Sequence, residues 1–156
     1  MNKNLPVIVK IAPDLDDQEL KDIASVLTRK NVDNFYELFN NYYLWLNLFF
    51  QKKIDGLIVS NTTVERPKSL KSSNKTETGG LSGRPLKEKS NQVTKRMYEL
   101  TNGELTIIGV GGIENGKDAL ERIKNGASLI QIYTAMVYQG PVIVNKLKRE
   151  LLNELK

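Results

Sequence analysis

Continuous apolar runs alternate with amphipathic segments along this chain. Residues 6–12 and 54–60 are almost entirely apolar, a pattern typical of strands buried on both faces of a parallel sheet. Residues 105–109 and 129–133 are the third and fourth predicted strands. A helical pattern follows each strand, so the sequence predicts an α/β fold of four successive βα units around a parallel sheet.

The predicted helices carry recognisable start and stop signals. Asp16 and Glu19 have the spacing of a capping box at the start of the first helix. Residues 86–100 and 117–125 are amphipathic, and each segment is followed by a glycine that favours a helix end. Pro141 suits the first turn of a final helix that reaches residue 155.

The segment 31–53 does not follow this pattern. It holds most of the aromatic residues of the chain, and the helix before it and the strand after it would join naturally without it. One interpretation is an added amphipathic helix that contacts a membrane or a partner, since its aromatic residues and leucines can share a helical face. We favour the other interpretation, a lineage insertion or a translated intron within the domain.

Composition excludes several kinds of chemistry. The 156 residues suffice for one domain, but they include no cysteine and no histidine. Disulfides, thiolate nucleophiles, histidine acid–base catalysis and most transition-metal sites are therefore not expected, and we predict no metal. The net charge of +5 comes without a basic block, which argues against nucleic-acid binding. The sequence contains no signal peptide and no run of about 18 apolar residues, so we predict no membrane segment within this chain.

The strongest sign of a binding site is the glycine pair at the end of the third strand. Gly111 and Gly112 follow that strand, and Tyr133 and Thr134 follow the fourth. Glycines let backbone N–H groups approach an anion, and a helix N-terminus facing it adds a favourable dipole. Because successive parallel strands are neighbours, both strand ends can hold one phosphate, as in the last two loops of (β/α)8 barrels.

Further polar residues are expected at the same end of the sheet. Lys10 lies inside a buried strand pattern, so its ammonium group must meet a ligand anion, carbonyl oxygens or a structural ion partner. Ser60, Asn61 and Thr62 could bind a planar polar ligand or could form an ordinary turn. The glycine-rich segment 79–83 could approach a ligand closely or could simply be flexible.

Taken together, these motifs resemble class 2 dihydroorotate dehydrogenases, the membrane-associated enzymes that reduce quinones. The matching segments occur in family order at residues 9–15, 55–63, 77–83, 108–112, 126–129, 131–134 and 140–141. The resemblance covers nearly the whole chain except 31–53. It implies the C-terminal half of a (β/α)8 TIM barrel, strands five to eight, with residues 1–156 forming a partial FMN-binding domain.

The resemblance implies FMN as cofactor, (S)-dihydroorotate as substrate, orotate as product and ubiquinone as electron acceptor. Lys10 would lie beside the pyrimidine edge of the flavin, and Asn61 and Thr62 would bind the orotate ring and its carboxylate. Tyr133 would also lie towards the quinone tunnel. The implied flavin and phosphate contacts are Lys10, Ser60, Ser82, Gly83, Gly111, Gly112, Tyr133 and Thr134.

Parts of the family's machinery are expected outside this chain. The catalytic base of the family is a serine in the first half of the barrel, so no residue here is assigned that role. The membrane helices and the segment that targets the eukaryotic enzyme to the mitochondrial inner membrane also belong to the N-terminal part. Since a barrel needs eight βα units, typically about 250 residues, we expect this fragment to be inactive alone. The alternatives are a non-catalytic remnant, a mispredicted gene product, or another phosphate-binding barrel enzyme.

Overall fold

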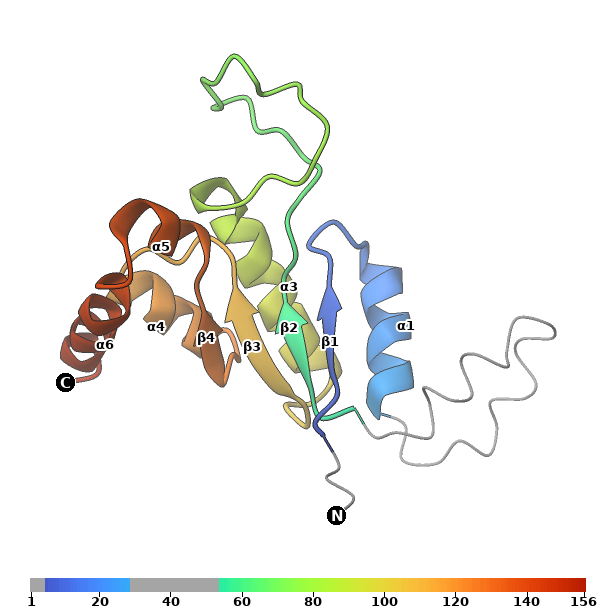
Figure 1. Cartoon of the computed structure of the whole chain (residues 1–156). Coiled ribbons are helices and arrows are strands. Elements are labelled where there is room, and N and C mark those ends of the chain that lie inside the picture. The colour runs from blue at the N-terminus through green and yellow to red at the C-terminus, as the bar shows by residue number, and fades with distance from the viewer. Residues whose placement is uncertain (1–4, 29–53) are drawn as a thin grey trace.

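The computed structural model describes residues 5–28 and 54–156, which form a parallel sheet covered by helices (Figure 1). The strands are β1 (Ile8–Ile11), β2 (Gly56–Val59), β3 (Thr106–Val110) and β4 (Leu129–Gln131). All neighbouring pairs are parallel, and the order in the sheet is β1-β2-β3-β4. The predicted α/β fold with four successive βα units is confirmed.

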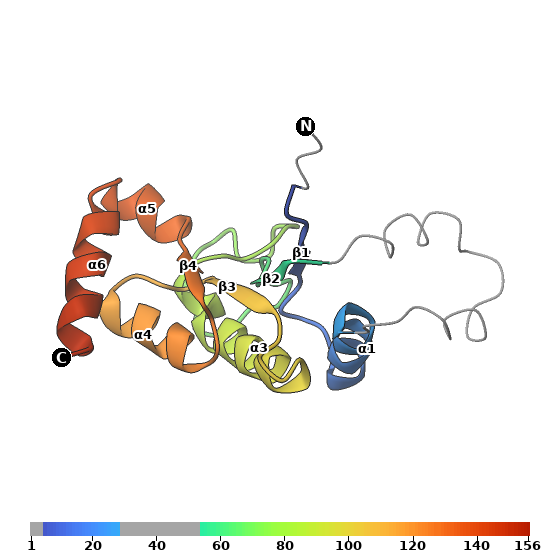
Figure 2. The same cartoon turned by 90° about the horizontal axis from the view of Figure 1, so that it is seen from below.

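Three helices cover one face of the sheet, as Figure 2 shows from below. They are α1 (Asp17–Thr28), α3 (Lys87–Leu100) and α4 (Gly116–Lys124). Two more helices follow β4, α5 (Thr134–Gln139) and α6 (Ile143–Glu154), and α6 packs against α4. The sequence pattern did not predict α5 or the short 3-10 helix η2 (Arg84–Leu86), because neither is long enough to show a helical period.

The capping box at the start of α1 is formed as predicted. The Asp16 N–H donates to Glu19 Oε2 at 2.8 Å, and the Glu19 N–H donates to Asp16 Oδ1 at 2.8 Å. The two side chains thus satisfy backbone donors that have no partner within the helix. This local exchange fixes where α1 begins after the β1 strand.

The main core lies between the sheet and its helices. Leu57 and Ile107 point from β2 and β3 towards Met97 of α3, and all three side chains are fully buried. Leu20 and Ala24 of α1 complete this layer beside β1. Alternate strand residues point to the opposite face of the sheet, since side chains alternate along a strand.

That opposite face is open, which corrects the prediction that the strands are buried on both sides. Ile8 of β1 is 41% exposed and Leu129 of β4 is 56% exposed, and the Lys10 side chain is exposed as well. The row Lys10, Ile58, Ile108 and Leu129 runs across this face in register. No element among residues 5–28 and 54–156 covers it, and β1 and β4 each keep one edge without a partner strand.

A long polar loop connects β2 to η2, as predicted for residues 65–83. Its base is closed by Thr63 and Leu81, which exchange backbone hydrogen bonds of 3.1 and 2.8 Å. The Arg66 guanidinium donates to the carbonyl oxygens of Gly79 at 2.6 Å and Glu77 at 3.1 Å. These bonds hold the loop so that its glycine-rich end returns to the sheet.

The predicted insertion at residues 31–53 lies outside the described residues. Among the helices that the structure does describe, none combines the length and the apolar character needed to cross a bilayer.

Candidate functional site

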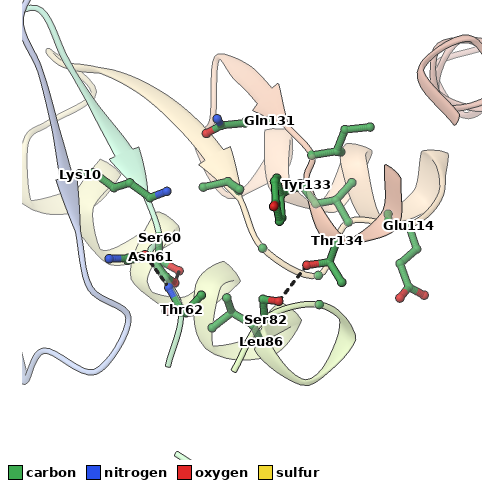
Figure 3. A pocket seen from close by; sticks show the side chains of 17 residues that line it. Lys10, Ser60, Asn61, Thr62, Ser82, Leu86, Glu114, Gln131, Tyr133 and Thr134 are labelled. Atoms are coloured by element: carbon green, nitrogen blue, oxygen red, sulfur yellow. Dashed lines mark hydrogen bonds between the residues drawn. The ribbon is translucent and has the colours of Figure 1, made fainter. Parts of the chain in front are cut away.

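A cleft of about 110 Å³ lies at the carboxyl ends of the strands (Figure 3). Parallel α/β folds place their binding sites at this end of the sheet. All the candidate site residues named from the sequence line it: Lys10, Ser60, Asn61, Thr62, Ser82, Gly83, Gly111, Gly112, Tyr133 and Thr134. Apolar side chains complete the wall, among them Leu86, Ile113 and Ile132. The structure therefore brings together residues that are far apart in the sequence.

Lys10 projects from β1 towards this cleft (Figure 3). It forms no ion pair within the part of the chain that the structure describes, so the structural ion pair considered above is not seen there. Its ammonium group is therefore available to an anion or a carbonyl oxygen of a ligand. Lys10 lies beside Ile58 in the β1–β2 register, at the open face of the sheet.

The turn after β2 is hydrogen-bonded to the two strands on either side of β2, which are β1 and β3. Buried Ser60 donates its N–H to the Val110 carbonyl oxygen at 3.1 Å, and Asn61 donates its N–H to the Ile11 carbonyl oxygen at 2.8 Å. The Asn61 Oδ1 atom accepts the Thr62 N–H at 3.0 Å, so the side chain bonds the backbone of its own turn. The Asn61 and Thr62 residues are exposed at the cleft, so a turn and a ligand contact are compatible here.

Close packing requires glycine at the turn after β3. Gly111 and Gly112 have φ values of +108° and +71°. A Cβ atom added to Gly112 would lie 2.5 Å from the Lys87 Cα atom, and one added to Gly111 would lie 2.9 Å from a methyl group of Leu86. The backbone of this turn therefore lies against the start of α3, in a conformation that other residues rarely adopt.

The end of β4 is tied to the glycine-rich loop. Thr134 Oγ1 donates to Ser82 Oγ at 2.9 Å, the contact drawn in Figure 3. A Cβ atom on Gly83 would lie 3.0 Å from the Thr134 methyl group, so the two segments touch closely. Tyr133, in contrast, is 72% exposed at the rim. The expectation that the Gly111-Gly112 and Tyr133-Thr134 strand ends are neighbours is confirmed.

The helix N-terminus that reaches the cleft is that of α5, which begins at Thr134. The N-terminus of α4 is already occupied by side chains. Asn115 accepts the Asp118 N–H at 3.0 Å, and Glu150 accepts the Gly116 N–H at 2.7 Å. These two N–H groups of α4 are therefore satisfied within the protein.

Sequence reasoning missed Arg122, which lies beneath the glycine turn. Its side chain is 0% exposed, and Gly109 leaves room for it because a Cβ atom there would overlap the Arg122 Cγ atom. Burial lowers the pKa of Arg122 to about 10, so the side chain remains charged at neutral pH. Arg122 follows Ala119 by three residues, so both lie on the buried face of α4. This spacing is the sequence signal that could have identified Arg122 as a buried residue.

A second missed group, centred on Asp14, holds the β2 turn. Asp14 Oδ1 accepts a hydrogen bond from Lys89 Nζ at 2.7 Å and one from the Thr63 hydroxyl, and Asp14 Oδ2 accepts the Val64 N–H at 2.9 Å. Partial burial alone would raise the pKa of Asp14, but the hydrogen bonds from Lys89, Thr63 and Val64 together lower it. These contacts fix the chain immediately after Asn61 and Thr62.

Acidification is expected to release the Asp14 contacts. The folded-state pKa lies below the ordinary value of 3.8, so the stabilisation is complete above that value and is lost as pH falls through the folded pKa. We expect the Val64 amide resonance to titrate with a midpoint below 3.8 and the Asp14→Asn variant to lose this titration. An Asp17→Asn variant, altered at an exposed carboxylate of α1, serves as the control and keeps it. A Val64 midpoint at or above 3.8 would contradict the role of these bonds.

Comparison with known proteins gives a consistent result. The family model for dihydroorotate dehydrogenase matches residues 45–155. The mitochondrial dihydroorotate dehydrogenase (quinone) of Mus musculus is 47% identical over 150 residues, which cover 96% of this chain and 32% of that protein. The dihydroorotate dehydrogenase (quinone) of Rhodospirillum rubrum is 46% identical, over 97% of this chain and 35% of that protein.

A solved structure shares the fold. The crystal structure of DHODH from Eimeria tenella in complex with ferulenol matches with a TM-score of 0.79 and 46% identity, over 99% of this chain and 35% of that chain. The chain thus spans about a third of the length of the relatives it matches. The prediction of part of a TIM barrel is confirmed, and the alternative of an unrelated phosphate-binding barrel is removed.

Proposed function

The chain belongs to the dihydroorotate dehydrogenase family, and we propose that it supplies the FMN platform and part of the substrate site of a quinone-dependent enzyme. The complete enzyme would oxidise (S)-dihydroorotate to orotate and pass the electrons to a quinone, a step of pyrimidine biosynthesis. The observation that carries this proposal is the convergence of Lys10, Asn61, Thr62 and the glycine turn on one cleft.

The residues of the cleft fit FMN. The turn at Gly111 and Gly112 presents its backbone to the cleft, and Ser82 and Thr134 line the same cleft with hydroxyl groups. Lys10 offers a cation at the opposite end of the cleft, suited to negative charge on a flavin ring. When bound, FMN supplies the hydride-accepting chemistry, and the protein provides binding, orientation and electrostatics. Ser60 is buried beneath the same region and positions the β2 turn.

Substrate recognition is proposed for Asn61 and Thr62. Their amide and hydroxyl groups are exposed in the cleft that Lys10 also lines, and they can match the donors and acceptors of a planar ring with a carboxylate. Glu114 is the carboxylate that lines the cleft, but it is paired with Arg84 at 2.9 Å. It is therefore not assigned as the base, which we place in the N-terminal part of the complete enzyme.

The quinone and the membrane are proposed to lie beside α5. Tyr138 is 84% exposed, and Tyr133, Val137 and Val142 are also largely exposed around this helix. These side chains form an apolar surface next to the cleft, which suits an apolar electron acceptor and the N-terminal membrane helices of a complete enzyme. Since the mouse relative is named mitochondrial, we propose the mitochondrial inner membrane as the site of a full-length eukaryotic protein.

Reconstitution tests the proposal. The chain is co-expressed with the part of the Rhodospirillum rubrum relative that precedes the matching segment, and the purified complex is assayed for flavin absorbance and dihydroorotate-dependent quinone reduction. We expect both signals from the complex and no turnover from the chain alone, whose sheet face and edges are open. A stable complex that contains no flavin would contradict the FMN assignment. A flavin-loaded complex that fails to oxidise dihydroorotate would contradict the substrate assignment.

A further inference from the structure

Arg122 is a buried cation without an anionic partner in the described part of the chain. Its guanidinium donates to the Val110 carbonyl oxygen at 2.9 Å, to the Gly111 carbonyl oxygen at 2.8 Å and to Asn91 Oδ1 at 2.6 Å. No carboxylate among the described residues forms an ion pair with it. A buried charge of this kind is costly unless hydrogen bonds and a nearby opposite charge stabilise it.

These bonds fix the end of β3. The Val110 carbonyl oxygen accepts three donors, which are the Ser60 N–H at 3.1 Å, the Ser90 hydroxyl at 2.6 Å and the Arg122 guanidinium at 2.9 Å. A carbonyl held from three sides cannot rotate without breaking several bonds. The peptide group that enters the glycine turn is therefore set in one orientation.

Among the described residues, only Arg122 donates a hydrogen bond to the next peptide group. The guanidinium holds the Gly111 carbonyl oxygen, and the Gly111–Gly112 peptide bond is trans, so the Gly112 N–H points away from the guanidinium. This N–H forms no hydrogen bond within the described residues, and Gly112 lines the cleft. Arg122 thus leaves a backbone donor free at the place where an anion would bind.

The buried charge also acts on the cleft directly. At a given distance, two charges interact more strongly in the protein interior than in water, so a cation beneath the turn favours an anion above it. Asn91 provides a neutral acceptor for Arg122, and its own Nδ2 atom is buried without a hydrogen-bond partner. Unlike a carboxylate, this neutral amide adds no negative charge to those of Glu121, Asp118 and Glu88 near Arg122. Two of these carboxylates, Asp118 and Glu121, are themselves paired with Lys87.

We propose that Arg122 is a positioning residue for the phosphate of the flavin: it orients the Val110-Gly111-Gly112 backbone and supplies the buried positive charge beneath it. This inference rests on the proposed function, since it concerns the phosphate end of the same cleft. Arg122 itself does not reach the ligand. Its action is specific for the phosphate group and leaves the binding of the ring system unchanged.

The test compares FMN with riboflavin, which lacks the phosphate. Binding to the 156-residue chain is measured by quenching of flavin fluorescence. We expect Arg122→Met to weaken FMN binding by about tenfold or more, because the buried charge is lost, and to leave riboflavin binding unchanged. Arg122→Lys keeps the charge and is expected to show a smaller loss. Lys124→Met, which removes an exposed cation of the same helix, is the control and should bind FMN like the wild type.

Asn91→Asp tests the charge without removing the arginine. The carboxylate keeps the hydrogen bond to Arg122 and neutralises it, so the fold is retained even if Arg122→Met does not fold. We expect this variant to weaken FMN binding and to leave riboflavin binding unchanged. Unchanged FMN binding, or an equal loss for both flavins, would overturn the proposed role of Arg122.

Inorganic phosphate separates this inference from the proposed cofactor. In the wild-type chain, phosphate should shift the Gly112 amide resonance, and this response should be lost in Arg122→Met and weakened in Asn91→Asp. A phosphate response at Gly112 without FMN binding would contradict the FMN proposal and still support Arg122. A wild-type chain without any phosphate response at Gly112 would overturn the inference.

Discussion

Replacing Gly112 by alanine is expected to weaken FMN binding by about a hundredfold or more. The added Cβ atom would lie 2.5 Å from the Lys87 Cα atom, and the φ of +71° is unfavourable for alanine. Backbone atoms of α3 cannot yield as the end of a side chain can, so the turn must move away from the cleft. A hundredfold loss of affinity corresponds to about 2.8 kcal/mol, which is about the contribution of one or two hydrogen bonds to a charged group. The dissociation constant for FMN, measured by fluorescence, gives the result.

Gly140→Ala is a matched control for this experiment. Gly140 has nearly the same φ, +72°, but nothing lies within 4 Å of an added Cβ atom. It therefore reports the cost of the backbone conformation alone, while Gly112→Ala adds the clash with α3. Equal FMN affinities for the two variants would show that the close approach to Lys87 does not shape the phosphate site.

Leu57→Ala is expected to lower the free energy of unfolding by about 2–5 kcal/mol, the usual range for a buried leucine. The Leu57 side chain is 0% exposed, in the layer between β2 and the helices. Small domains have total stabilities of only about 5–15 kcal/mol, and this chain leaves one sheet face open, so the variant should be largely unfolded. Urea unfolding followed by circular dichroism measures the change.

Leu129→Ala provides the comparison on the open face of the same sheet. Because Leu129 is exposed, the substitution should change the stability of the isolated chain by less than about 0.5 kcal/mol. In the reconstituted complex the same face is expected to be covered, and the substitution should then weaken assembly. A large effect of Leu129→Ala in the isolated chain would show that this face is already buried in solution, for example by self-association.

Local sequence patterns predicted the elements and the chemistry of the strand ends. The capping box at Asp16 and Glu19 and the glycines at 111 and 112 could be found because each depends on a few neighbouring residues. The gathering of Lys10 and Thr134 at one cleft followed from the rule that parallel strands end on the same side.

Other features depended on packing that no local pattern reveals. Ile8 and Leu129 belong to apolar strands that the sequence pattern predicts to be buried, yet both are exposed. Their burial depends on whether another element covers that face of the sheet. Arg122 belongs to a residue type usually found at the surface, and its burial depends on the space left by Gly109. The Asp14 contacts join residues about 50 to 75 positions apart, so no local sequence pattern could predict them.

The unpaired edges of β1 and β4 also bear on how a purified sample of this chain behaves. Each edge offers backbone donors and acceptors in the geometry that another extended segment needs, so copies of the chain can join edge to edge. This association needs two molecules, whereas folding needs one, so a concentrated sample loses monomer faster than a dilute one. Wherever the edges lack partner strands, the lifetime of the monomer is therefore governed by protein concentration as well as by the folding free energy.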